Sequence, residues 1–207
     1  MSPETATQDR IYLAVKRDYW EGKFWPTERV DIRAIADRHI TSPTPVREVL
    51  SRFVGERLFE HRTEGGFWPA TPTSDGLRDL YTLYRDLIRL ALASADTQRL
   101  RGVLYAHRAR AFNSHPFVVS HATASFFDGI AEASANRELG DLIHNLNERL
   151  LLVRAAEAMV LDGVEQEMRA MTRNGLVDIR SVIGKRVARY HARRIDRVDE
   201  IVNRMCA

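Results

Sequence analysis

The hydrophobic pattern of the first 70 residues changes period once, and this change limits the folds open to the chain. Apolar residues first recur at the spacing of one helix face in three segments, residues 9–22, 31–39 and 46–53. Two short stretches then alternate as β-strands do, residues 58–62 and 67–70, around the turn Glu64-Gly65-Gly66. Two helices, a turn, a third helix and a two-stranded hairpin predict a winged helix-turn-helix.

Beyond residue 75 the sequence has helical patterns and no strand-like alternation. A short polar linker, residues 69–74, precedes them. Breaks in the apolar pattern predict six helices, at about 75–95, 97–111, 117–135, 137–160, 163–173 and 178–204. We therefore expect a mainly α protein, with a winged helix-turn-helix at residues 1–72 and an all-α six-helix bundle at residues 73–207.

Composition excludes several classes of protein. No apolar run approaches the roughly 18 residues that span a bilayer, and residues 1–10 are polar without a signal-peptide core. We expect a cytoplasmic protein that does not bind membranes. The single cysteine, Cys206, excludes a disulfide within the chain and a cysteine-based metal site.

Net charge does not identify the partner. The formal charge of +3 invites a nucleic-acid interpretation, yet residues 1–70 hold 11 basic and 11 acidic side chains. The surplus lies mostly in residues 173–207, where nine basic residues face four acidic ones. DNA binding by the first 70 residues therefore depends on where individual arginines point.

The third helical pattern has the residues that a DNA-reading helix needs. In a helix-turn-helix the second helix of the pair enters the major groove with its N-terminal turn, where Thr44 and Arg47 lie in this chain. The forked donors of an arginine can engage a guanine or a phosphate at two points. Arg33, near the start of the preceding helix, is expected to lie against the DNA backbone.

Residues 11–70 resemble the DNA-binding domain of the GntR family of bacterial regulators. The most distinctive match is the string Thr44-Pro45-Val46-Arg47-Glu48, and Ile35-Ala36-Asp37 and the glycine-tipped hairpin also fit. The resemblance implies that the wing glycines allow a close approach to the minor groove. It implies DNA contacts by six residues in all: Arg33, Ser42, Thr44, Arg47, Gly65 and Gly66.

Two positions depart from the family pattern. The family usually has an arginine where this chain has Pro43, and a glycine where it has Arg57. Loss of that arginine removes one contact, worth about 1–3 kcal/mol if it read a base. We expect the affinity or the operator sequence to differ from those typical of the family.

The C-terminal part resembles the all-helical effector domain of the FadR-type branch, and its six predicted helices indicate the VanR-like subgroup. Residues 80–86 and 126–139 carry this resemblance. Many relatives hold a divalent metal there with one aspartate and three histidines. Two of those positions correspond to Thr123 and Phe127, and the others fall near Glu165 and Arg186, with His191 as a possible remaining ligand. The sequence therefore predicts that the metal site is lost and that no cofactor is bound.

An effector site without metal is the resulting hypothesis. Arg186 would supply a fixed cation for the carboxylate of an organic acid. A salt bridge between Arg186 and Glu165 that fills the space is the alternative. The candidate effector residues are Tyr84, Thr123, Phe127, Glu165, Arg186 and His191.

One winged helix contacts few base pairs, so specificity calls for a symmetric homodimer on an inverted-repeat operator. We predict a DNA-binding transcriptional repressor whose helical domain dimerises and binds a small molecule. No glycine-rich phosphate loop, nucleophile elbow or pair of catalytic carboxylates indicates an enzyme. The alternative is a helical interaction or scaffold protein with a degenerate DNA-binding module, for which Pro43 is the support.

Overall fold

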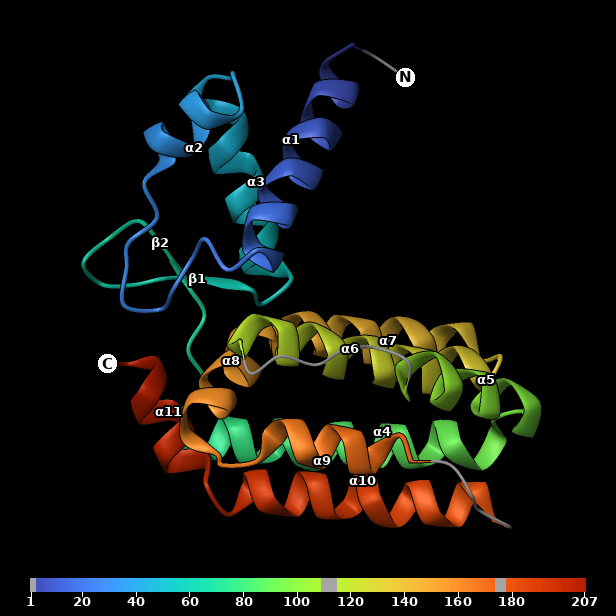
Figure 1. The fold of residues 1–207 in the computed structure, drawn as a ribbon. Helices are drawn as coiled ribbons and strands as arrows, with labels where there is room; N and C mark the ends of the chain where they lie inside the picture. Colours follow the sequence, from blue (N-terminus) through green and yellow to red (C-terminus); the bar gives the residue numbers. More distant parts are fainter. Residues whose placement is uncertain (1–2, 109–114, 174–177) are drawn as a thin grey trace. The chain divides into compact units, whose positions relative to one another are not determined.

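The computed structural model describes residues 3–108, 115–173 and 178–207. The chain divides into two compact units, Met1–Thr71 with Met205–Ala207, and Pro72–Arg204. The two-stranded sheet belongs to the first unit, and the described part of the second unit is helical (Figure 1).

The first unit has the predicted order of elements. Its helices are α1 (Pro3–Trp20), α2 (Ile32–Arg38) and α3 (Pro43–Gly55). Strands β1 (Phe59–His61) and β2 (Phe67–Pro69) form an antiparallel hairpin in which Glu60 pairs with Trp68. The prediction of a winged helix-turn-helix is confirmed, although α1 begins well before the predicted start at residue 9.

A small apolar core holds these elements together. Phe53 of α3 and Phe59 of β1 stack with their ring centroids 5.7 Å apart. The N–H of Val30 donates to the carbonyl of Phe67 over 2.9 Å, so the segment between α1 and α2 is fixed to β2. Other buried core residues include Ile11, Val15, Ile35, Val46, Leu50 and Phe67.

The second unit is built from helices whose starts are capped by side chains. Thr73, Asn136 and Asp178 accept hydrogen bonds from backbone N–H groups in the first turns of three of them. The helices are α4 (Ser74–Ser94), α5 (Thr97–Arg108), α6 (Pro116–Ala133), α7 (Arg137–Arg149), α8 (Leu151–Val160), α9 (Val164–Met171), α10 (Ile179–Ile195) and α11 (Val198–Met205).

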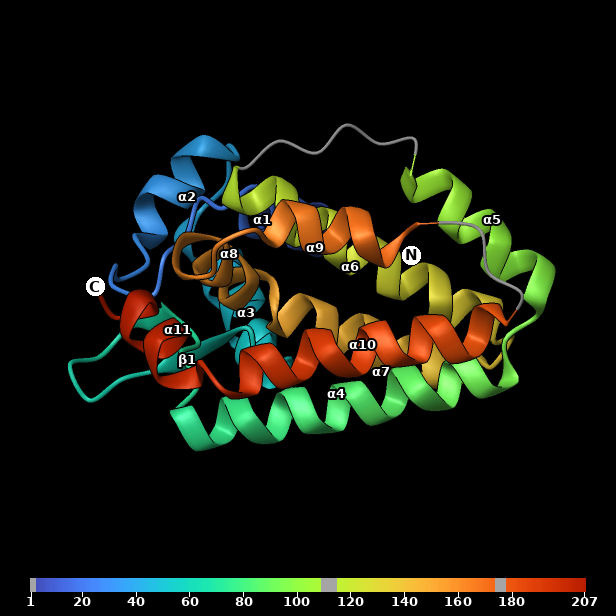
Figure 2. The ribbon, with the colours of Figure 1, turned by 60° about the horizontal axis from the view of Figure 1, so that its bottom comes forward.

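Helix α6 lies in the middle of this bundle and packs against α4, α5, α7 and α8. Its mean hydropathy is high because most faces are buried, including the rings of Phe126 and Phe127. Helices α4 and α10 run side by side, as both ribbon views show (Figure 2). The core of the unit therefore lies between α4, α6, α8 and α10.

The mainly α fold class is confirmed, but the six predicted helices need a correction. The predicted helix 137–160 is divided at Leu150, where ψ is 0°, and the predicted helix 178–204 is divided after Asp196. Neither point has a proline or glycine, so the sequence shows no breaker. The first division lets α8 enter the core, with every side chain from Leu150 to Glu157 buried. Residues 109–111 of the predicted helix 97–111 lie outside the described residues.

Candidate nucleic-acid interface and buried polar cluster

Helix α3 presents the two residues predicted to read DNA. Val46, Val49 and Leu50 face the core and are at most 4% exposed. The opposite face exposes Thr44 and Arg47 within the first two turns. This division follows from the apolar spacing, because residues three and four apart share one face of a helix.

The start of α3 explains why a proline is tolerated there. Ser42 is the N-cap residue, with extended backbone, and Pro43 occupies the first helical turn. A proline fits this position because its missing N–H would have no helical partner. The Ser42 side chain makes no capping hydrogen bond and is exposed.

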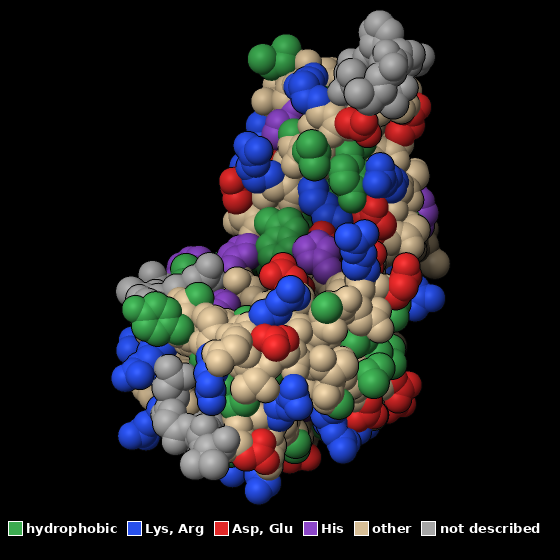
Figure 3. Space-filling view, turned by 90° about the vertical axis from the view of Figure 1, so that its right-hand side faces the viewer, with side chains coloured by type: hydrophobic (Ala, Val, Ile, Leu, Met, Phe, Trp, Pro, Cys, Tyr) green, Lys and Arg blue, Asp and Glu red, His purple; other side chains and the backbone are tan. Residues whose placement is uncertain are grey.

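Arg33 and Arg47 are exposed, and neither forms a hydrogen bond or ion pair with the described residues. Other arginines of this unit are engaged within it. Arg52 Nε lies 3.1 Å from Glu56 Oε1, and its guanidinium lies 3.8 Å from the ring centroid of Tyr12. Figure 3 shows Lys and Arg side chains interspersed with Asp and Glu on one face, in agreement with the balanced charge of residues 1–70.

The tip of the hairpin requires glycine. Gly65 and Gly66 have φ values of +80° and +83°, which side chains with a Cβ rarely adopt. Two residues that do carry side chains also have left-handed backbone, Ile40 with φ 51° and Arg57 with φ 60°. Arg57 directly follows the C-cap of α3, where a left-handed residue commonly ends a helix, so the departure from glycine places strain there.

In the second unit, polar side chains gather in the core between α4, α6, α8 and α10. We call this group the buried polar cluster: Tyr84, Asn147, Arg154, Glu157, Tyr190, His191 and Arg194. All are at most 2% exposed. Buried charges are costly unless they are paired, so each member of the cluster needs a structural or functional explanation.

One half of the cluster is a complete ion pair. Arg194 Nε donates to Glu157 Oε2 over 2.6 Å, and its Nη1 lies 2.9 Å from Glu167 Oε2. Tyr81 donates to the other carboxylate oxygen of Glu157. Burial and the neighbouring carboxylate raise the pKa of the Tyr81 hydroxyl well above its usual value.

The other half is less complete. Arg154 Nη1 donates to Asn147 Oδ1 over 2.8 Å, and the Tyr84 hydroxyl donates to the same oxygen over 2.6 Å. The Nε and Nη2 atoms of Arg154 have no hydrogen-bond partner among the described residues. The guanidinium lies 5.3 Å from the ring centroid of Tyr84 and 5.7 Å from that of Phe127.

His191 supplies an acceptor beside the same rings. Its centroid is 5.6 Å from that of Tyr84 and 5.8 Å from that of Phe127. Burial lowers the pKa of His191 to about 3, so its ring is neutral at neutral pH. Nδ1 lies 2.8 Å from the carbonyl of Val187 and so carries the proton, which leaves Nε2 as an acceptor without a partner in the described part of the chain.

The structure thus brings together three of the predicted effector residues, Tyr84, Phe127 and His191. Thr123 lies one turn before Phe127 on α6 and donates to the carbonyl of Val119 over 2.8 Å.

The other two predicted effector residues make contacts of their own elsewhere in the bundle. Glu165 pairs with Arg169 on α9 at 2.7 Å. Arg186 Nη1 donates to the carbonyls of Met171 and Arg173, over 3.2 and 3.0 Å. The described side chains therefore do not include the alternative Arg186–Glu165 salt bridge.

Arg154, Asn147 and Glu157 were missed by sequence reasoning. A signal was present, because Arg154 and Glu157 interrupt the otherwise apolar segment 150–158. A charged residue inside such a run is either on an exposed stripe or buried with partners, and the helical wheel alone does not separate the two.

Among the described residues, no three His, Cys, Asp or Glu side chains are grouped so as to hold a metal ion. The loss of the family metal site stays a prediction. None of the described helices is long and apolar enough to cross a membrane.

Comparison with known proteins gives the fold. No protein-family model matches the chain, and no curated protein matches its sequence. A solved structure described as a transcriptional regulator GntR from Rhodococcus sp. RHA1 has a TM-score of 0.77 at 17% identity, over 93% of this chain and 97% of that one. Escherichia coli McbR/YncC has a TM-score of 0.68 at 15% identity, over 93% and 96%. Lar, which controls the agr system of Listeria monocytogenes, has a TM-score of 0.56 at 10% identity, over 93% and 96%.

Proposed function

We propose that this chain, which has the fold of a GntR-type transcriptional regulator, binds DNA and regulates transcription. The observation that carries the proposal is the exposed N-terminal part of α3. There Thr44 and Arg47 are presented on a fold shared with regulators over 93% of the chain. Arg47 would read a base or phosphate in the major groove, with Ser42, Arg33 and the wing glycines contacting the backbone and minor groove.

The regulator would act as a homodimer on an inverted repeat. A single α3 covers only a few base pairs, and two copies related by a twofold axis would double the contacts at a fixed spacing. We propose repression, so that deletion of the gene raises transcription from the bound promoter. No catalytic step forms part of this proposal.

A mobility-shift titration with the promoter next to its own gene tests DNA binding. Arg47→Ala should weaken binding by about 1–3 kcal/mol, roughly 10- to 100-fold. Arg52→Ala is the matched control, because Arg52 lies on the same helix but is held by Glu56 and Tyr12. If the full-length protein binds no promoter fragment, or if Arg47→Ala binds undiminished, the regulator proposal fails and the alternative of a helical interaction protein gains support.

The effector would bind at the incomplete half of the buried polar cluster. Two N–H groups of Arg154 can donate to a carboxylate, and Nε2 of His191 can accept a hydrogen bond from a hydroxyl of the same ligand. The rings of Tyr84 and Phe127 would cover its apolar part. A small organic acid without a metal ion fits these groups.

A thermal-shift screen of small organic acids, with and without chelator, tests the effector site. At least one acid should raise the melting temperature in both conditions, and Arg154→Met should abolish the shift. Arg186→Ala should leave it unchanged, since Arg186 bonds to backbone carbonyls. If Arg186→Ala abolishes the shift while Arg154→Met preserves it, the effector binds at Arg186. Stoichiometric zinc or nickel in the purified protein would contradict the metal-free site.

A further inference from the structure

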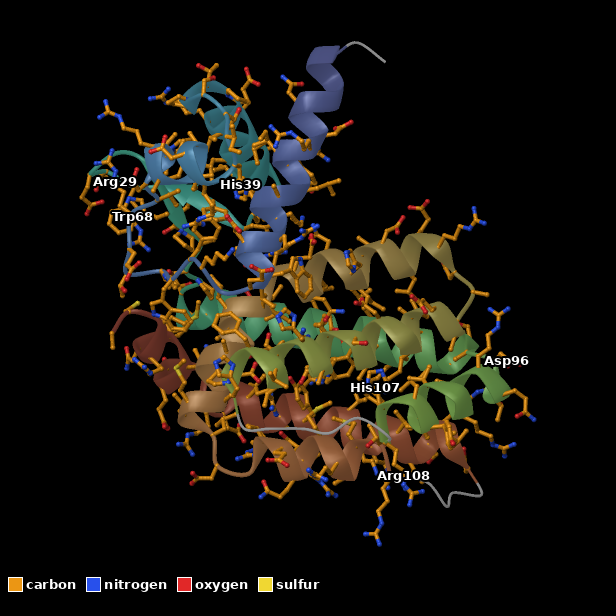
Figure 4. The ribbon with its side chains drawn as sticks, turned by 45° about the horizontal axis from the view of Figure 1, so that its top comes forward. Arg29, His39, Trp68, Asp96, His107 and Arg108 are labelled. Carbon is orange, nitrogen blue, oxygen red and sulfur yellow. The ribbon has the colours of Figure 1, made fainter. Side chains whose placement is uncertain are left out.

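The wing has a side chain packed on it from outside the hairpin. Arg29 lies in the segment between α1 and α2, next to Val30, whose N–H donates to the carbonyl of Phe67 in β2. This bond brings Arg29 to the hairpin. Figure 4 shows Arg29 and Trp68 at this end of the first unit.

The guanidinium of Arg29 occupies the space that a side chain at position 66 would need. A Cβ on Gly66 would clash with Nε of Arg29 and would lie 2.9 Å from Nη2 and 3.0 Å from Cζ. A Cβ on Gly65, whose φ is nearly the same, would meet nothing within 4 Å. Gly66 therefore makes room for Arg29, in addition to adopting a left-handed turn.

Arg29 is a cation that the first unit does not neutralise. It is exposed and forms no hydrogen bond or ion pair with the described residues. Arg62, the arginine of the hairpin, is engaged differently. It lies 2.8 Å from Glu60, donates to Thr71 and sits 4.7 Å from the ring centroid of Trp68.

We infer that Arg29 contacts a DNA phosphate beside the wing. This inference rests on the proposed DNA binding and adds a contact to it. The guanidinium lies along the wing backbone, so its outer N–H groups face the side of the hairpin. The sugar-phosphate strands flank the minor groove, so a wing that approaches the groove brings its sides close to phosphates. A charge-assisted hydrogen bond from arginine to phosphate follows.

Salt dependence of DNA binding by the full-length protein tests the contact. Each phosphate contact contributes about 0.9 to the slope of log K against log salt, so loss of two copies in a dimer lowers the slope by about 1.8. Arg29→Gln should show this lower slope, with the affinity reduced by a similar factor on the promoter next to the gene and on a mixed-sequence duplex of equal length.

Gly66→Ala and Gly65→Ala form a matched pair. Both add a Cβ at a left-handed residue, so both carry the same backbone strain. Gly66→Ala also displaces Arg29 and should reproduce the lower salt slope, whereas Gly65→Ala should keep the wild-type slope. Circular dichroism checks folding, and Arg29→Gln, an exposed change, carries the test if Gly66→Ala does not fold.

Three outcomes separate this inference from the proposed function. If the wild type binds no DNA, both fail. If the wild type binds and Arg47→Ala weakens it while Arg29→Gln keeps the wild-type slope and affinity, the Arg29 contact alone is overturned. If Arg29→Gln weakens only A·T-rich duplexes, Arg29 reads the minor groove and the phosphate assignment is overturned.

Discussion

Oδ2 of Asp18 and Nε2 of His39 lie 2.7 Å apart, which joins the end of α1 to the residue that ends α2. The same carboxylate receives Lys23 Nζ at 2.7 Å and Arg38 Nη1 at 2.8 Å. The Asp18 side chain is 3% exposed, although its lysine and arginine partners are about two-fifths exposed. One buried acid therefore fixes the helix pair that positions the DNA-reading helix.

Asp18→Asn should destabilise the protein by about 2 kcal/mol. A buried pair that loses one partner costs about 3–5 kcal/mol, and the partial exposure of the cations reduces this figure. Urea unfolding of both proteins at neutral pH measures the difference. Glu21→Gln is the control, because Glu21 also pairs with Lys23 but is half exposed, and it should change stability by less than about 0.5 kcal/mol. Equal losses for both variants would contradict this view of Asp18.

Acid unfolding should also involve Asp18. Burial opposes its ionisation, but hydrogen bonds from Lys23, His39 and Arg38 outweigh burial and hold the pKa of Asp18 below its usual value. The ionised carboxylate thus stabilises the fold above the unfolded pKa, about 3.9. This stabilisation is lost as the pH falls below about 4. Asp18→Asn should lack this part of the acid-induced loss.

A second titration belongs to His191. Because burial lowers its folded-state pKa to about 3, protonation favours the unfolded chain, whose histidine titrates near 6.5. Stability is full above pH 6.5 and falls as the pH drops toward 3, by up to about 1.4 kcal/mol per pH unit. His191→Phe should flatten the pH dependence of unfolding between pH 6 and 4. An unchanged slope in this variant would mean that His191 is not held neutral.

Two strained positions should be improved by glycine. Ile40 is 89% exposed with φ 51°, so its side chain adds little packing while its backbone is left-handed. Left-handed backbone costs about 1–2 kcal/mol for a residue with a Cβ, and the entropy of glycine offsets part of the gain. Ile40→Gly should therefore stabilise the protein by about 1 kcal/mol, as should Arg57→Gly. Thermal melts test this, with Ile40→Ala as a control that keeps the Cβ and should gain less.

These residues mark how far the sequence predicts the molecule. Apolar spacing predicted the helix order, the hairpin and the exposed face of α3, because all three depend on local periodicity. The division at Leu150 was not predictable, since it arises from packing of α8 into the core without a local breaker. Arg154, Glu157 and Arg29 were missed for a similar reason. Their partners lie far away along the chain, and only the tertiary fold brings them together.

Arg154 and Arg194 should respond in opposite ways to the same substitution. Arg194→Met leaves Glu157 buried without its cation and should cost about 3–5 kcal/mol. Arg154→Met removes a buried charge that has two N–H groups without partners among the described residues, and leaves no carboxylate that it had paired. Replacement of such a group by an apolar side chain of similar length is neutral or stabilising by about 1–4 kcal/mol.

Urea unfolding of the two methionine variants without added acid measures this contrast. A residue that lowers stability while supplying donors to a ligand fits a binding role, so Arg154→Met should be at least as stable as the wild type and unresponsive to organic acids. A loss of more than about 2 kcal/mol in Arg154→Met would instead assign Arg154 to the structural half of the cluster, together with Arg194.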